Sequence, residues 1–443
     1  MEDKITELTT KIAALETSGG MLGTVSVEVF YWWCTAIMIC IHAGFLAYEM
    51  GASRSKNVLA SGIKNILAFA FIVPTFYFFG WWIYLAFPNG FIPVEAGNAG
   101  LPWAPEMGPN LQDNASGVFW AAFVLFAATT ASIFSGAVIE RIRVSSFVAL
   151  AILLGSVVWI LAASWSWHPD GWLLKKWGYH DVGCAGLIHV IAGFFALGVL
   201  LNLGPRVGRF NPDGTANPLL PHNIPMSLIG LMLIIVGFFG FLGACLIFNP
   251  GAQWTNIYGQ PATLSSYAFN TLMCFSGGII GAWVTTRDPF WMMSGALAGI
   301  FAAAAGLDVW YPPLAFLLGF LGGVIIKPGN DFLVRMGIDD SVGAVSVHGF
   351  AGIIGVLAVG IFATGYPNPG DAPPTSFAGQ FVGLIVMLLC GFIPGYLASL
   401  GLKSAGVLRV PDEAQELGLD ACEVPARAFP EAVGSRSVVQ PAE

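Results

Sequence analysis

The sequence predicts an all-α polytopic membrane protein, and three observations support this. Hydrophobic residues make up 56% of the 443 residues and charged residues only 10%, whereas ordinary soluble domains carry about 25% charged residues. The mean hydropathy is +0.74. Apolar runs recur along the chain with short polar breaks between them, so a single membrane domain over residues 25–402 explains the length better than several soluble domains do.

Eleven apolar runs are long enough to cross a bilayer, since a helix needs about 20 residues to span about 30 Å of hydrocarbon. They lie near 25–51, 60–87, 116–139, 144–166, 182–204, 225–248, 264–285, 290–305, 311–326, 341–363 and 377–402. An odd number of spans places the two termini on opposite sides of the membrane. We therefore predict eleven transmembrane helices in a multi-pass protein of the cell membrane, in contact with its lipid.

Lysine and arginine predict the orientation. One set of loops, together with the C-terminal tail at 403–443, holds 14 of the 18 basic residues. The other four are Lys4, Lys11, Lys175 and Lys176. Because basic residues are enriched in cytoplasmic loops, we expect the N-terminus outside and the tail in the cytoplasm. The net charge of -8 belongs to loops and tail and does not indicate a nucleic-acid partner.

Residues 1–20 form a polar arm that we expect to lie outside the membrane as an amphipathic helix. No cleavable signal peptide is expected, because a basic segment followed by a short apolar run is missing here. The apolar residues Ile5, Leu8, Ile12 and Leu15 are spaced as in a coiled coil, and Gly19-Gly20 predicts the end of the helix. Two heptads leave two interpretations open, an oligomeric helix bundle or a frayed surface helix.

One motif occurs twice, at Asp181 to Gly193 and at Asp340 to Gly352, and both copies read D-x7-H-x3-G. Each histidine, His189 and His348, lies about 12 Å along a helix from the aspartate. The predicted orientation makes the two copies run in opposite directions. Spans 1–5 and 6–10 then form an inverted repeat, which is common in transporters and places the site at the bilayer midplane.

Two histidines at symmetric depth favour a pathway for protons or ions over a pair of ordinary core histidines bonded to backbone carbonyls. A neutral imidazole donates from one nitrogen and accepts at the other, so facing rings can pass hydrogen bonds across an apolar passage. Asp181 has two readings: it is an ordinary N-cap of the fifth helix, or it also acts on the substrate.

Several further motifs, together with the repeated one, resemble the ammonium transporter and Rhesus (Amt/Rh) channel family, and are closer to its ammonium transporter branch. Ser53-Arg-Ser-Lys-Asn57 is similar to the family's R-x-K-N turn, and Ser135 to Arg143 resembles its G-A-x-x-E-R segment. The remaining segments are Gly237 to Phe241, similar to the family's W-F-G-F, and Leu408 to Asp412 with Gly418 to Asp420, similar to its regulatory tail.

The resemblance implies ammonium transport by trimers whose subunits each contain a pore. It implies that Asp181, Trp167, Phe126 and Cys245 recruit the substrate outside, that Phe126 and Phe241 are stacked rings gating the pore, and that His189 and His348 are the twin pore histidines. A PII-type regulator at the tail is a possible partner. From the sequence alone the two phenylalanines are lipid-facing or core residues. We expect no enzyme activity, cofactor or metal site, because no nucleophile, metal cluster or phosphate loop is evident.

Some positions depart from the family pattern. Cys245 stands where a serine usually follows the F-N-A-G segment, and a thiol is the poorer hydrogen-bond donor. Gly343 replaces a second acid, and the first span carries an additional His42 and Glu49. We interpret Glu49 as an ion-pair partner of Arg54 in preference to a residue of the site. The weaker recruitment site keeps open a second function, an ammonium-binding sensor or receptor with little transport.

Overall fold

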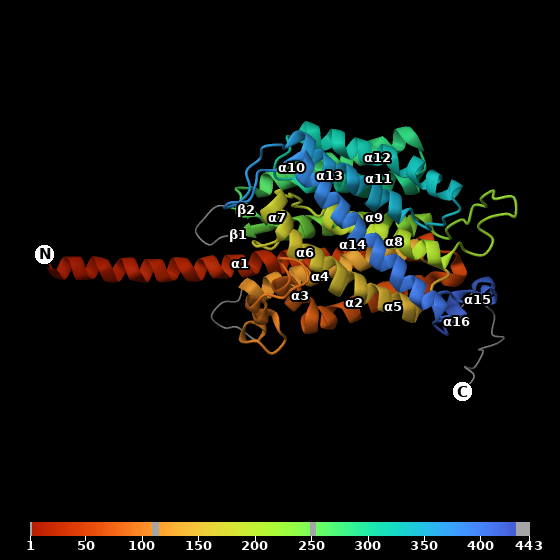
Figure 1. Ribbon diagram of the computed structural model, residues 1–443, viewed down its shortest axis with the longest axis horizontal. Coiled ribbons are helices and arrows are strands. Elements are labelled where there is room, and N and C mark those ends of the chain that lie inside the picture. The colour runs from red at the N-terminus through yellow and green to blue at the C-terminus, as the bar shows by residue number, and fades with distance from the viewer. Residues whose placement is uncertain (1, 109–114, 249–253, 431–443) are drawn as a thin grey trace.

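The computed structural model of the protein describes residues 2–108, 115–248 and 254–430. In this part of the chain, eleven helical segments are long and apolar enough to cross a membrane, and they pack side by side in one bundle (Figure 1). They are Lys4–Ala52, Ser55–Ala86, Phe119–Ala137, Val144–Ser166, Ala185–Leu203, Ile224–Ala244, Leu264–Thr285, Pro289–Gly306, Pro312–Arg335, Val345–Phe362 and Phe377–Ser404. The predicted all-α polytopic membrane fold is confirmed.

Some spans consist of several helical elements in succession. The second contains α2 (Val58–Thr75), a π-helical turn and α3 (Trp81–Ala86), and the fourth contains α5 (Val144–Leu153), a π-helical turn and α6 (Ile160–Ser166). The other elements are α1 (Glu2–Ala52), α4 (Ala115–Ala137), α7 (Trp172–Trp177), α8 (Ile191–Leu203), α9 (Ile224–Ala244), α10 (Leu264–Thr285), α11 (Pro289–Phe301), α12 (Pro312–Arg335), α13 (Ala351–Phe362), α14 (Phe377–Ser404), α15 (Asp412–Leu417), α16 (Leu419–Cys422), β1 (Leu246–Phe248) and β2 (Trp254–Asn256).

Two predicted boundaries are wrong. The sixth span was expected to reach residue 248, but α9 ends at Ala244 and the next residues form β1, which pairs antiparallel with β2. The ninth span was expected to end at 326, but α12 continues to Arg335 with Pro328 inside it. Lys327 and Asp331, whose charges suggested a loop, form an ion pair one turn apart on the exposed side of this helix.

The N-terminal arm is helical, but it does not end at Gly19-Gly20. Helix α1 runs without a break from Glu2 to Ala52 and projects far beyond the bundle (Figure 1). A glycine inside a helix costs only about 1 kcal/mol, too little to end a helix that is continuous with a membrane span. The four apolar residues of the predicted coiled-coil stripe remain more than half exposed, so the oligomeric interpretation stays a prediction.

Glycines allow α1 and α9 to pack in close contact. A Cβ atom added to Gly44 would lie 2.6 Å from the carbonyl oxygen of Gly230, and one added to Gly230 would lie 2.6 Å from the carbonyl oxygen of Gly44. Both distances are too short for any side chain. Small residues of this kind drive helix association in membranes, where van der Waals contact replaces the hydrophobic effect.

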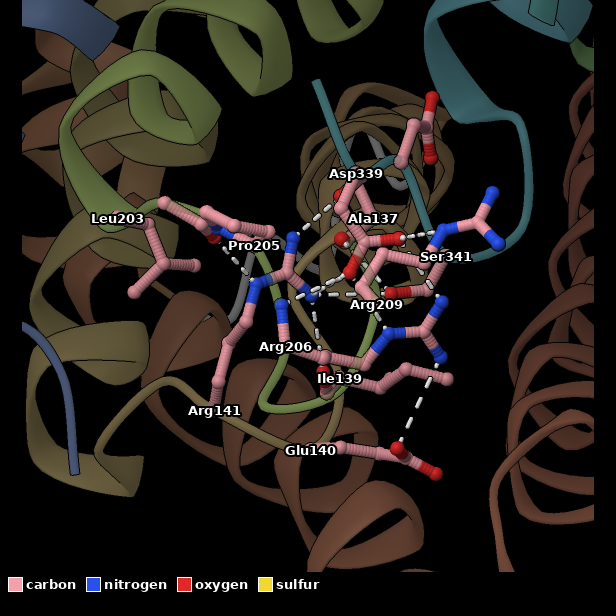
Figure 2. A network of polar contacts seen from close by, with 12 residues as sticks. Ala137, Ile139, Glu140, Arg141, Leu203, Pro205, Arg206, Arg209, Asp339 and Ser341 are labelled. Atoms are coloured by element: carbon pink, nitrogen blue, oxygen red, sulfur yellow. Dashed lines mark hydrogen bonds and ion pairs between the residues drawn. The ribbon is translucent and has the colours of Figure 1, made fainter. Parts of the chain in front are cut away.

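A buried charge network connects three loops at the end of the bundle near α15 and α16 (Figure 2). The carboxylate of Asp339 accepts hydrogen bonds from the backbone N, Nε and Nη2 of Arg206 at 3.0, 2.8 and 2.9 Å. Arg141 donates to the backbone carbonyl of Asp339 and to Ser341. Burial alone would raise the pKa of Asp339, but Arg141 and Arg206 hold it well below its ordinary value.

The C-terminal tail packs against this same end of the bundle and contacts its basic loops. The side chain of Gln415 accepts a hydrogen bond at 3.2 Å from the backbone N of Val207, the residue after Arg206. Asp420 accepts a hydrogen bond from the backbone N of Ala60 at 2.8 Å, where it lies at the positive N-terminal end of α2. Backbone bonds join Val410 to Arg141 at 3.0 Å, so the tail is an ordered part of the fold as far as residue 430.

Candidate functional site

Asp181 caps the fifth span with both carboxylate oxygens. Oδ1 accepts from the backbone N of Ala185 at 2.8 Å, and Oδ2 accepts from Gly186 at 2.9 Å and Leu187 at 2.8 Å. The Tyr179 hydroxyl donates to Oδ2 at 3.2 Å. Burial raises the pKa of Asp181 although these donors oppose the shift. The capping role is therefore evident in the structure, whereas a direct role on the substrate stays a prediction.

The second copy of the motif has the same local structure. The carboxylate of Asp340 accepts from the backbone N of Gly343 at 3.0 Å and of Val345 at 2.7 Å. Each copy then begins with a π-helical turn, at Ala185–Val190 and at Val345–Phe350, before the regular helix α8 or α13. Such turns are rare in proteins as a whole, and those that occur are often found at functional sites. Each one contains the histidine of its motif.

The two imidazoles meet inside the bundle. Nδ1 of His189 lies 3.1 Å from Nδ1 of His348, within hydrogen-bonding distance, so one ring donates and the other accepts. His189 is fully buried, and His348 is 4% exposed. The close approach depends on glycine, because a Cβ on Gly193 would lie 2.7 Å from the Cα of Gly349. The repeated motif predicted this pairing, and its role in a pore stays a prediction.

A phenylalanine that the sequence did not single out covers the pair. The ring of Phe301, the last residue of α11, stacks on His189 with 3.6 Å between ring centroids and on His348 with 4.5 Å. Phe238 of α9 packs nearby, 5.5 Å from Phe301 and 6.2 Å from His189. These side chains surround the histidines with apolar surface, which disfavours a charged imidazole.

The predicted outer aromatic residues also come together. The Phe126 and Phe241 rings meet at 4.6 Å, but edge to face at 69° and not in the face-to-face stack that we expected. Trp167 lies 5.8 Å from Phe126 and donates from Nε1 to the backbone carbonyl of Asp181 at 2.9 Å. All these side chains are at most 1% exposed, so the cluster is closed to solvent in this conformation, and its role as a gate stays a prediction.

Cys245 lies beside this cluster, just after the end of α9. Its Sγ lies 3.4 Å from the backbone carbonyl of Phe241, to which the thiol can donate, and it interacts with the thiol of Cys184. An ammonium ion only donates hydrogen bonds, and a thiol sulfur is a weak acceptor, so Cys245 offers a cation little here.

A second polar cluster, not predicted from the sequence, lies next to Asp181. The Nε2 of His180 is 3.2 Å from Asp308 Oδ1, and the Asn256 amide donates to Oδ2 of the same carboxylate at 2.7 Å. Tyr258 accepts at its hydroxyl from the backbone N of Asp181 at 3.0 Å. The sequence contains a signal for this cluster, because Asp308 is a single acid in a long apolar stretch.

The interpretation of Glu49 as the partner of Arg54 is wrong. Arg54 binds Glu140 instead, with its backbone N 2.5 Å from Oε1 and its Nε 2.7 Å from Oε2. Glu49 is fully buried and accepts from the hydroxyl of Ser135. His42, the other additional residue of this helix, packs edge to face on Phe69 at 5.6 Å, and its ring does not take part in the stacking around the pair.

Together, the bundle and its buried histidine pair define a polytopic helical membrane protein. Within that class, the chain belongs to the ammonium transporter family: the model described as "Ammonium Transporter Family" matches residues 29–429. Ammonium transporter Amt2 of Methanocaldococcus jannaschii is 32% identical, covering 88% of this chain and 87% of that protein. Amt1 of the same organism is 29% identical, covering 91% and 97%.

Solved structures show the same fold. One titled "Sensor Amt Protein" superposes with a TM-score of 0.79 at 26% identity, covering 91% of this chain and 99% of that chain. Mep2 of Candida albicans superposes with a TM-score of 0.72 at 20% identity, covering 87% of this chain and 86% of that chain. At this lower identity the likeness concerns the fold alone.

Proposed function

We propose that the protein carries ammonium across the membrane by splitting it into ammonia and a proton. The observation that carries the proposal is the 3.1 Å contact between the buried nitrogens of His189 and His348, in a chain of the ammonium transporter family. A charged group at the bilayer centre is disfavoured, by about 3 kcal/mol on insertion scales and by more than 10 in simulations. A neutral ammonia molecule avoids this cost.

Recruitment takes place at the outer cluster around Asp181. Aromatic faces of Trp167 and Phe126 attract a cation that is losing its water, and the carboxylate of Asp181 contributes the negative potential that its backbone donors leave uncompensated. Deprotonation there transfers the proton to water, and the ammonia that remains passes Phe126 and Phe241, whose rings must move apart because they are in contact.

The histidine pair then handles the proton. Because the two Nδ1 atoms share one hydrogen bond, a proton added to one ring can be passed to the other as the bond reverses. Potassium cannot lose its charge in this way. Selectivity then depends on the chemistry of the ion, and net current requires the proton to cross separately from ammonia.

We also propose that three subunits assemble, with the ordered tail as the surface that a cytoplasmic PII-type regulator contacts. The structure of the tail favours the regulator surface, because residues 410–420 are joined by hydrogen bonds to α2 and to the loop after α4. A bound regulator could thus act on the membrane domain through a rigid connection.

We further propose that the N-terminus lies outside, as the distribution of basic residues predicts.

A second candidate function is an ammonium sensor that conducts slowly or not at all. Two observations favour it: the ring of Phe301 stacks against both histidines, and a similar solved structure is titled "Sensor Amt Protein". An ammonium pulse applied to purified protein in liposomes separates the two functions. Transport predicts a transient current that potassium does not produce, whereas a flat trace together with saturable ammonium binding identifies a sensor.

A further inference from the structure

A small cavity lies next to the histidine pair, on the side of the bundle where the tail packs. Its volume is about 10 Å³, and it is lined by residues of α1, α4, α11 and the turn that carries His348. A cavity needs roughly this volume to hold one water, and ammonia is of similar size. His348 lines it, whereas the fully buried His189 does not.

Glu49 of α1 lines the same cavity and has an unused acceptor. Its Oε1 accepts from Ser135, while Oε2 is buried and makes no hydrogen bond of good geometry within the described residues, although the side-chain amide of Asn65 lies near the carboxylate. Leaving a buried polar atom unpaired is unfavourable, and more so for a charged group. The free oxygen therefore favours a small donor molecule in the cavity.

The charges around Glu49 suit a group that gains and loses a proton. Lys64 is nearly buried and donates to the backbone carbonyl of Ser135 at 3.3 Å, so a positive charge lies close to the carboxylate without a direct ion pair. The other acid near the cavity, Asp340, is occupied by two backbone N–H groups. The remaining ionisable side chain of the lining is Tyr48, whose hydroxyl donates to Val342 at 3.4 Å.

We propose that Glu49 and His348 form an inner proton-exchange site that takes one water-sized molecule and returns the proton to ammonia. This inference rests on the proposed function. A proton from the imidazolium of His348 is transferred to the carboxylate of Glu49, directly or through the molecule in the cavity. Ammonia arriving there takes the proton at its lone pair, so ammonium and the carboxylate are regenerated and both mass and charge balance.

The test compares ammonium-driven current in liposomes for wild type, Glu49→Gln and the control Glu7→Gln, because Glu7 lies exposed on the N-terminal arm. Gln keeps the size and polarity of the side chain but cannot exchange a proton. We expect Glu49→Gln to lose about a hundredfold or more of the current, with ammonium binding unchanged and Glu7→Gln equal to wild type. Wild-type current in a folded Glu49→Gln protein would overturn this inference alone.

Failure of the proposed transport can be told apart from failure of this inference. No current in wild type would overturn the proposed transport, and this inference with it. If Glu49→Gln does not fold, Glu49→Asp keeps a carboxyl group, and infrared difference spectra between ammonium and potassium should show a carboxylic-acid band that differs in frequency between wild type and Glu49→Asp. A spectrum without such a difference would overturn the assignment of the proton to Glu49.

Discussion

Replacing Asp339 by asparagine should strongly destabilise the protein, because this carboxylate holds the loop that precedes the second copy of the histidine motif. Its side chain is 1% exposed, and that of its partner Arg206 is 6% exposed. Arg209 adds a contact at 3.2 Å. Breaking a buried pair by removing one charge costs about 3–5 kcal/mol, since the other charge stays buried without compensation. Glu140, 3.7 Å from Arg206, offsets part of that cost, so we expect about 3 kcal/mol.

The matched control is Asp331→Asn. Asp331 also forms an ion pair with a basic residue, Lys327, but their side chains are 43% and 33% exposed. Exposed pairs contribute about 0–1 kcal/mol. Unfolding of the detergent-solubilised variants by heat or by denaturant measures both losses of stability. Equal losses of stability in the two variants would refute the reasoning that burial makes the Asp339 network strong.

The same network predicts a pH dependence. The pKa of Asp339 is lower in the folded protein than its ordinary value, because Arg141 and Arg206 outweigh the effect of burial. Its contribution is therefore fully present above the unfolded pKa of about 3.9 and is lost as the pH falls through the lower folded value. Wild type should lose more stability than Asp339→Asn on acidification below about pH 4. Parallel pH curves for the two proteins would contradict the lowered pKa.

Three further changes test the pore and the tail. Asp181→Asn should lower the unfolding temperature and weaken ammonium binding, because both oxygens accept backbone N–H groups and an amide NH2 would face one of them; unchanged stability would rule out this cap geometry. Phe301→Ala should speed ammonium flux or admit potassium, and it should lower stability by about 3–5 kcal/mol. Slower flux that still excludes potassium would show that the ring does not narrow the path. Proteolytic removal of residues after Val410 should weaken the membrane domain, measured by its unfolding temperature, and no change would make the ordered tail irrelevant to the fold.

The spans and the histidine pair could be predicted because their signals are local and periodic. Apolar length identifies a membrane helix, and the repeated D-x7-H spacing places each histidine at a fixed height above its cap. Phe301 could not be found this way, because it is one of 34 phenylalanines and only tertiary packing brings it to the imidazoles. The π-helical turns have no sequence signal that we recognised.

The misassignment of Glu49 has a similar cause. Arg54 is five residues away along the chain, and proximity in sequence suggested the pair. Arg54 instead reaches Glu140, whose backbone adopts a left-handed conformation at φ 70° in the turn after α4. That turn directs the acid toward Arg54 and leaves Glu49 facing the cavity beside His348.

The most direct test of the proposed mechanism is the ammonium-driven current of His189→Gln and His348→Gln in liposomes, with potassium as the comparison ion. Glutamine keeps a polar side chain but does not readily exchange a proton. The account predicts that each variant folds and binds ammonium at the outer site but loses the current. Wild-type, potassium-excluding current in both variants would contradict the proton relay, and the pair would then be structural residues that shape the passage.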